Sequence, residues 1–143
     1  PLMRPLFYEY VHDSKTFDID TQFLIGSDLM VKPVTEENQQ SLEVYLPGDE
    51  PWYEFEDGNK FDGDKSTVNI QTPKEKIPVL QRGGSIIPIK QRVRRTSSSM
   101  KNDPFTLLIA LSSKSDAHGE VYVDDENSFN FKYKNEFIHR KLQ

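Results

Sequence analysis

Cysteine is absent from the 143 residues of this chain. Its absence excludes disulfide bonds, thiolate nucleophiles and zinc sites built on cysteine. It does not decide the compartment, because secreted and lumenal domains without cysteine are common. Histidine offers no substitute: His12, His118 and His139 lie far apart, and no second histidine follows any of them at a helical spacing. Neither a zinc site nor a Ser-His-Asp triad is therefore expected.

Excess basic charge and long apolar runs are also lacking. The formal net charge is -5, whereas a nucleic-acid-binding protein needs a basic face to displace counterions. No run approaches the roughly 18 to 20 apolar residues that a membrane-spanning helix needs. We therefore expect neither a nucleic-acid nor a membrane partner. One local basic cluster is present, made of Lys90, Arg92, Arg94, Arg95 and Lys101.

Alanine occurs only at Ala110 and Ala117, whereas there are nine prolines and many Val, Ile, Thr, Tyr and Phe residues. This composition disfavours long helices and favours strands. Short apolar or alternating runs recur between turn residues, so we predict an all-β fold, an antiparallel β-sandwich with little helix. The expected strands are residues 2–10, 29–34, 42–46, 52–55, 66–70, 78–80, 85–89, 105–111, 119–123 and 130–133.

The patterning of these runs predicts which faces are buried. Residues 43–46 and 120–123 alternate between apolar and polar, so each run should bury one face. Residues 105–111 are apolar almost throughout and should be buried on both faces. Arg82-Gly83-Gly84 lies between two apolar runs, so we expect a tight turn there rather than an RNA contact of the repeated Arg-Gly-Gly kind.

One short helix of one or two turns is expected within residues 16–23. Thr16 or Asp18 could cap its amino terminus, and Gly26 would end it. Phe23 would pack inward.

Acidic residues gather in turns, where carboxylates usually face solvent or bond their own backbone. The turn at residues 124–127 offers oxygen ligands that suit calcium, but it lacks the ligand spacing and the glycine of an EF-hand loop. We therefore assign no catalytic, cofactor-binding or metal-binding residue. The acidic clusters are Glu54, Glu56 and Asp57; Asp62 and Asp64; and Asp124, Asp125 and Glu126.

Two further groups allow a functional and a structural interpretation. Trp52, Tyr53 and Phe55 could stack on a sugar ring, but strand alternation puts Trp52 and Phe55 on opposite faces, so one of them is expected in the core. Arg94-Arg95-Thr96-Ser97 would suit a kinase that recognises basic residues, but we favour an exposed loop.

An ordered series of motifs resembles glycoside hydrolase family 31. It begins with Arg4-Pro5-Leu6-Phe7 and continues with Gln22-Phe23-Leu24-Ile25-Gly26, which look like the exit from the catalytic (β/α)8 barrel of that family. The series extends across nearly the whole chain. The later motifs are Val31-Lys32-Pro33-Val34; Val44-Tyr45-Leu46-Pro47-Gly48 with Trp52-Tyr53; Arg82-Gly83-Gly84-Ser85-Ile86-Ile87-Pro88; and Asp124-Asp125 with Ser128-Phe129.

This resemblance implies a retaining α-glucosidase that uses two carboxylic side chains and no cofactor. Residues 92–97 and 100–104 look most like the glucosidase II branch. The branch implies trimming of glucose from N-glycans in the endoplasmic reticulum lumen, with glucosylated oligosaccharide as substrate and a non-catalytic β-subunit as a partner. The nucleophile motif of the family, Trp-x-Asp-Met-Asn-Glu, has no match here, and its general acid lies upstream. No catalytic residue is carried onto this chain, which we expect to be structural and inactive alone.

The resemblance also implies a domain division. Residues 1–10 would end the catalytic barrel, residues 11–88 would form the proximal C-terminal β-sandwich, and residues 89–143 would begin a truncated distal β-domain. We expect the chain to be part of a larger enzyme, with residues 2–10 disordered or paired between chains once their barrel neighbours are lost.

One position departs from the family pattern: Glu126 stands where the family has glycine, so we expect Asn127 to take the positive φ. Two other functions stay open at this point. Trp52-Tyr53 and the basic cluster would suit a carbohydrate-binding or subunit-docking β-sandwich module. A stand-alone β-sandwich protein unrelated to hydrolases is the third interpretation.

Overall fold

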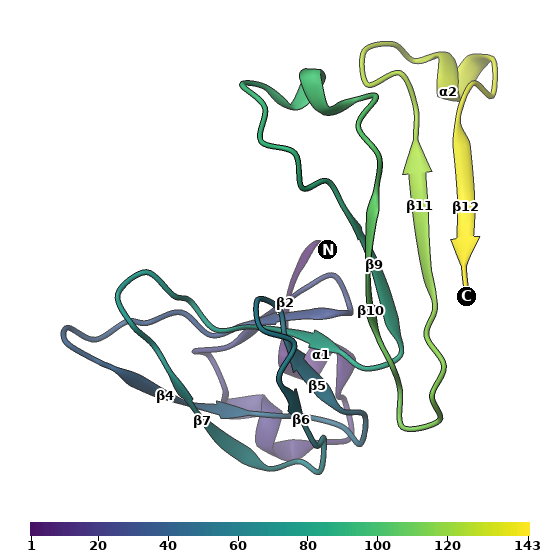
Figure 1. Cartoon of the computed structure of the whole chain (residues 1–143). Helices are drawn as coiled ribbons and strands as arrows, with labels where there is room; N and C mark the ends of the chain where they lie inside the picture. The colour runs from purple at the N-terminus through teal and green to yellow at the C-terminus, as the bar shows by residue number, and fades with distance from the viewer.

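The structure, a computed structural model, describes residues 1–143 and consists mainly of short strands (Figure 1). None of its helices combines the length and the hydrophobicity needed to cross a bilayer. The helices are α1 (Leu6–Glu9), η1 (Ser14–Asp18), η2 (Ser97–Met100) and α2 (Asn130–Tyr133), where η denotes a 3-10 helix. The strands are β1 (Met3–Pro5), β2 (Phe23–Ile25), β3 (Leu29–Val31), β4 (Ser41–Tyr45), β5 (Trp52–Glu54), β6 (Lys60–Phe61), β7 (Thr67–Gln71), β8 (Val79–Arg82), β9 (Ser85–Ile89), β10 (Thr106–Ala110), β11 (Gly119–Val123) and β12 (Ile138–Leu142).

A two-sheet sandwich forms the first part of the chain. Its larger sheet has six strands in the order β1-β2-β3-β8-β5-β6, and β4 pairs with β7 in the smaller sheet. All of these pairs are antiparallel. Leu24, Leu80 and Trp52 of the larger sheet share one core with Val44 of β4 and Leu6 of α1, and all five are 0% exposed. The prediction of an antiparallel sandwich with little helix is confirmed.

A second group of strands lies beside the sandwich, at the right of Figure 1. β9 pairs with β10, and β11 pairs with β12, both antiparallel. β11 meets β9 at its start, where the Ile86 N–H donates to the His118 carbonyl over 2.8 Å. A Cβ on Gly119 would lie 2.2 Å from the Ile86 carbonyl oxygen, so a side chain there would prevent this close approach.

The chain passes from the sandwich to the second group through Gly83-Gly84, and the predicted tight turn is confirmed. Gly84 has a φ of +87°, and its N–H donates to the Ala110 carbonyl over 2.8 Å. The Gly83 N–H donates to the Pro51 carbonyl over 2.7 Å. A Cβ on Gly83 would lie 2.8 Å from the carbonyl oxygens of Leu111 and Pro51. The turn is therefore a close joint between the two groups of strands.

Alternation along a strand predicts burial where a second layer is present. Val44 is 0% exposed while Glu43 faces solvent, but Tyr45, on the face opposite Val44, is only 7% exposed, so residues 43–46 do not bury one face alone. Residues 120–123 alternate as expected between half-buried and exposed. The prediction that residues 105–111 are buried on both faces is wrong. β10 has only β9 as a neighbour, and the outward side chains of this run are 43–57% exposed because no layer covers them: Phe105, Leu107, Ile109 and Leu111.

The prediction of a helix within residues 16–23 is wrong in the length of the helix and in the residues that cap it. η1 ends at Asp18, and Asp13 caps it by accepting a hydrogen bond from the Lys15 N–H over 3.3 Å. Phe23 belongs to β2, and Gly26, with a φ of +65°, turns β2 into β3 instead of ending a helix. Pairing of β2 with β1 and β3 outweighs the local preference of these residues for a helix.

Two other segments differ from the prediction. Residues 2–10 are ordered against the sandwich, because β1 pairs with β2 and Leu6 enters the core; the expected disorder is wrong. Residues 130–133 form α2 instead of a strand. The Ser128 hydroxyl oxygen accepts the Asn130 N–H over 3.1 Å and so favours a local turn over an extended backbone.

Candidate functional site

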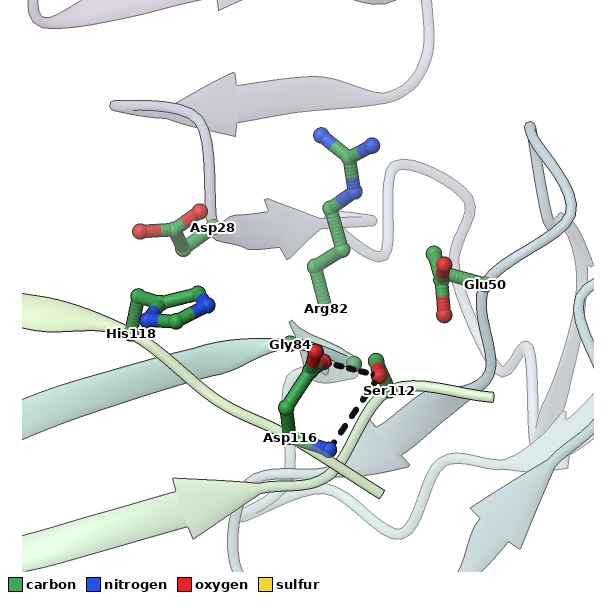
Figure 2. A pocket seen from close by; sticks show the side chains of 8 residues that line it. Asp28, Glu50, Arg82, Gly84, Ser112, Asp116 and His118 are labelled. Carbon is green, nitrogen blue, oxygen red and sulfur yellow. Dashed lines mark hydrogen bonds between the residues drawn. The ribbon is translucent and has the colours of Figure 1, made fainter. Parts of the chain in front are cut away.

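A polar hollow of about 250 Å³ lies at the joint between the sandwich and the second group of strands. Figure 2 shows its side chains, which come from both parts of the fold, Arg82 from the end of β8 and the others from segments between strands. The hollow is lined by Asp28 before β3, Glu50 before β5, Arg82 at the end of β8, Gly83 and Gly84, and by Ser112, Asp116 and His118 between β10 and β11.

Two carboxylates of the hollow already hold loops together. Glu50 Oε2 accepts the Ser113 N–H over 2.7 Å and so ties the sandwich to the loop after β10. Asp116 accepts a hydrogen bond from the Ser112 hydroxyl within that loop (Figure 2). No group of three histidine or acidic side chains in the structure could hold a metal ion. The arrangement therefore fits a structural joint better than a catalytic centre.

Arg82, the cation of the hollow, also contacts the sandwich. Its Cζ lies 5.4 Å from the centre of the Tyr10 ring. The Tyr10 hydroxyl is buried and has no hydrogen-bond partner. Burial raises the pKa of Tyr10 to about 12, although the positive charge of Arg82 acts in the opposite direction. The phenol is therefore neutral at ordinary pH and contributes packing rather than proton transfer.

The first acidic cluster contains a buried ion pair rather than only solvated turn acids. Glu54 is 6% exposed, and Lys76 Nζ lies 2.5 Å from its Oε1 and 2.9 Å from Asp57 Oδ2. Asn59 donates to the other Glu54 oxygen over 3.1 Å. Hydrogen bonds to Glu54 and Asp57 raise the pKa of Lys76 above its ordinary value. The remaining acids of the first two clusters face solvent: Glu56, Asp62 and Asp64.

The acidic turn at residues 124–127 is closed by its own hydrogen bonds. Asp125 accepts the Ser128 hydroxyl over 2.7 Å and the Ser128 N–H over 3.1 Å, and these bonds lower the pKa of Asp125. This use of the carboxylate gives no support to a calcium site. Glu126 has a φ of +60°, so the expectation that Asn127 takes the positive φ is wrong. Asp125 also accepts the Asn127 N–H over 3.4 Å, which fixes Asn127 in the turn.

The three histidines lie in different parts of the fold. His12 is exposed in the turn after α1, and His118 lines the hollow. His139 Nε2 lies 2.8 Å from Glu120 Oε2, across the β11-β12 pair. The structure therefore does not assemble them into one site.

The interpretation that Trp52 stacks on a sugar ring is wrong, because this side chain is 0% exposed. Trp52 shares the inward face of β5 with Glu54, and its Nε1–H donates to the Pro47 carbonyl over 3.1 Å. The Tyr53 hydroxyl donates to the Leu111 carbonyl over 2.9 Å and adds a second bond across the joint. Both residues are structural.

The basic cluster belongs to a loop that connects β9 to β10, residues 90–105, which we call the arginine loop. Arg94 donates to Asp103 twice, over 2.9 Å from Nε and 2.7 Å from Nη2. Arg92 Nη1 lies 3.6 Å from the same carboxylate. The hydrogen bonds from Arg94 lower the pKa of Asp103. Lys90 Nζ donates to the Met100 carbonyl over 2.7 Å. Much of the cluster therefore organises its own loop.

Sequence reasoning missed the role of Gln22, which is 4% exposed. Its Oε1 accepts the Tyr45 N–H and its Nε2 donates to the Tyr45 carbonyl, each over 2.9 Å. The Tyr45 hydroxyl donates to Asp13 Oδ2 over 2.7 Å, and burial raises the pKa of Tyr45. The only sequence feature that pointed to a buried role for Gln22 was its position as a polar residue at the start of an apolar motif. Gln22, next to β2 of the larger sheet, thus links the two sheets through Tyr45 of β4, and Asp13 ties the start of η1 to the same residue.

A comparison with protein families identifies the chain. The model of the glycosyl hydrolase family 31 C-terminal domain matches residues 1–87. The chain belongs to glycoside hydrolase family 31. Neutral alpha-glucosidase AB of Dictyostelium discoideum is 45% identical over 99% of the chain and 15% of its own length. The predicted family is therefore confirmed.

Solved structures agree with this assignment. A glucosidase II alpha subunit with alpha3-Glc2 bound superposes with a TM-score of 0.93 at 36% identity, over 99% of this chain and 15% of that one. The catalytic subunit in an ER glucosidase II heterodimeric complex, which includes the binding domain of the regulatory subunit, gives a TM-score of 0.92 at 36% identity and the same coverage. The chain thus spans about 15% of the length of these relatives.

Proposed function

We propose that this chain is the supporting C-terminal β-domain of a retaining α-glucosidase of the glucosidase II type. The parent enzyme removes glucose from glucosylated N-glycans in the endoplasmic reticulum lumen, with two carboxylic side chains outside this chain and no cofactor. The observation that carries the proposal is 45% identity to an α-glucosidase over 99% of the chain. The hollow and the acidic clusters, whose carboxylates are exposed or hold loops and ion pairs, support a non-catalytic role.

Within that parent, residues 1–10 lead out of the catalytic barrel and already pack on the proximal sandwich through β1 and Leu6, residues 11–88 form the rest of that sandwich, and residues 89–143 begin the distal β-domain. Two observations support the second boundary. The chain leaves the six-stranded sheet at Gly83-Gly84, and the family match ends at residue 87. β9 spans the boundary and would serve as the connection.

The catalytic barrel is the first partner of this domain. Around α1 and η1 the sandwich exposes an apolar surface, which we call the α1 patch, close to the end where the barrel would join. The Phe7 and Phe17 rings lie edge to face with centroids 6.3 Å apart. Covering such a surface is worth about 25 cal/mol per Å² of apolar area removed from water. The patch consists of Phe7, Tyr8, Val11 and Phe17, which are 43–57% exposed.

Activity measurements test the proposed function. The full-length protein should hydrolyse a chromogenic α-glucoside, and the 143-residue chain should not. Hydrolysis by the chain alone, or an inactive full-length protein with intact carboxylates, would contradict the proposal.

A matched pair of variants tests whether the catalytic barrel covers the α1 patch. Val11→Asp places a charge in the α1 patch, whereas Val93→Asp places it on the arginine loop, at a side chain 97% exposed. In the full-length protein, Val11→Asp should lower the melting temperature and Val93→Asp should not. Neither substitution should change the melting temperature of the isolated 143-residue chain. Equal behaviour of the two full-length variants would show that the barrel does not cover the patch.

We also propose that the parent pairs with a non-catalytic β-subunit. This rests on the heterodimeric complex formed by a protein 36% identical to the chain. Co-purification of the full-length protein with a β-subunit tests it, and a strictly monomeric enzyme at micromolar concentration would argue against it.

A further inference from the structure

The arginine loop presents a stretch of backbone that is free on both sides. It projects beyond the ends of β9 and β10 at the top of Figure 1. Residues 91–99 are all exposed, and Val93 is 97% exposed. No N–H or C=O of residues 91–95 takes part in a backbone–backbone hydrogen bond, and Thr96 is extended, with φ -144° and ψ 155°. Proteases bind a substrate as an added extended strand, which requires such a free backbone.

The side chains of this stretch are the ones that basic-directed serine proteases recognise. Arg94 and Arg95 are adjacent, and Arg92 precedes them by one intervening residue. Arg92 and Arg94 lie within ion-pair distance of Asp103, whereas Arg95 has no carboxylate within that distance. A planar guanidinium can pair with the acidic specificity pocket of a trypsin-like enzyme. Arg95 is therefore the residue best placed to enter such a pocket.

We propose that the Arg95–Thr96 peptide bond is a processing site for a serine protease that recognises paired basic residues. The bond between the Arg95 carbonyl carbon and the Thr96 nitrogen is hydrolysed. Water supplies the hydroxyl of the new Arg95 carboxyl group and a proton for the new Thr96 amine. The step requires no oxidant or reductant.

Several contacts cross this bond and keep the two halves together after cleavage. β9 and β10 pair over five residues, from Thr106↔Ile89 to Ala110↔Ser85. Lys90 Nζ donates to the carbonyls of Met100 and Lys101 over 2.7 and 3.0 Å. The product is therefore a two-chain form that stays folded, rather than two separate pieces.

Asp103 controls how easily the site is used. Its carboxylate, 6% exposed, holds Arg94 in a two-point contact, and a protease that recognises paired arginines must take Arg94 from it. Arg95 needs no such release. Asp103 therefore slows a protease that reads both arginines more than one that reads Arg95 alone.

Limited digestion of the complete chain tests the proposal. At a low trypsin ratio, the first cut should leave residues 1–95 and 96–143, which co-elute on native size exclusion and separate only under denaturing conditions. Arg95→Gln should abolish this first cut. The matched control is Arg140→Gln, which removes an exposed arginine whose backbone is paired in β12 and should change nothing. A first cut elsewhere, or halves that separate on cleavage, would overturn the proposal.

A second protease tests the recognition of both arginines. Arg94→Ala should abolish cleavage by a subtilisin-type protease specific for paired basic residues, while trypsin still cuts after Arg95. Asp103→Asn should speed cleavage by the paired-basic protease about two- to fivefold, the range for an ion pair whose arginine is 40% exposed. Equal rates for the parent chain and Asp103→Asn would show that Arg94 is not restrained, and retained cleavage of Arg94→Ala would remove the paired-arginine requirement.

Discussion

The buried phenol of Tyr10 provides the sharpest test of the packing described here. Its hydroxyl has no hydrogen-bond partner, and the ring lies against Gly48 and under Arg82. A buried hydroxyl without a partner costs about 1–3 kcal/mol. Replacing it with hydrogen leaves the ring contacts in place. Tyr10→Phe is therefore expected to raise the free energy of unfolding by about 1 kcal/mol at pH 7.

The pH dependence of this effect follows from the raised pKa. The phenol has an ordinary pKa of 10.0 and a pKa of about 12 in the folded chain, so burial favours the neutral form. The folded state binds the proton more tightly, and the stability linked to it is complete below pH 10 and lost as pH rises through 12. At pH 11 the ionisation of Tyr10 accounts for a loss of about 1.4 kcal/mol in the parent chain, and this contribution is absent from Tyr10→Phe.

Urea denaturation at pH 7 and pH 11 measures both effects. The advantage of Tyr10→Phe over the parent chain should grow by about 1.4 kcal/mol between the two pH values. Tyr8→Phe is the matched control: Tyr8 is 53% exposed, so removing its hydroxyl should change stability at neither pH. A Tyr10→Phe variant less stable than the parent at pH 7, or a pH-independent difference, would refute an unpartnered buried phenol.

Three further substitutions probe the core and its polar links. Gln22→Ala removes both hydrogen bonds to the Tyr45 backbone and should lower the free energy of unfolding by about 2–4 kcal/mol in urea denaturation. Trp52→Ala empties a fully buried site and should cost about 3–5 kcal/mol by the same measurement. Because the pKa of Lys76 is raised, the stability from its ion pair is complete below pH 10.5 and is lost progressively as pH rises from there through the raised pKa. Lys76→Met should therefore be less stable than the parent at pH 7, leaving Glu54 unpaired, and should lose less stability on moving to high pH.

Matched controls come from the same residue types on the surface. Gln91→Ala and Lys74→Met alter exposed side chains and should leave stability unchanged. If Gln91→Ala cost as much as Gln22→Ala, the clamp on Tyr45 would not be the cause. A Lys76→Met variant with the same high-pH slope as the parent would contradict the Glu54–Lys76 pair, and a mild Trp52→Ala phenotype would argue against a core around Trp52.

The local sequence was enough to predict structure where the backbone conformation of a few neighbouring residues decides it. Alternation over residues 43–46 predicted the burial of Val44 and the exposure of Glu43, because side chains on a strand point to opposite faces. It did not predict that Tyr45, on the face opposite Val44, is buried as well. The Gly83-Gly84 turn was also predictable, since Gly84 takes a φ of +87°, which other residues adopt only at a cost. The order of motifs was enough to predict the family.

The local sequence did not predict the burial or the secondary structure of segments whose packing or pairing partners lie far away in the chain. Residues 105–111 look buried by composition, but β10 lies at a sheet edge and no layer covers its outer face. Phe23 was assigned to a helix because its strand partners lie in β1 and β3, which the local pattern does not show. The hollow could not be predicted either, since Asp28, Glu50 and Asp116 come from loops far apart in the chain.

The amino-acid sequence by itself determined the strand-rich class, the family and the absence of the family's nucleophile motif, because composition, alternation and motif order are properties of the chain. The tertiary structure alone decided which polar residues are structural. Gln22 and Tyr45 are 23 positions apart, yet two hydrogen bonds join them. Such contacts depend on how the sheets stack, and stacking places residues together that no local pattern relates.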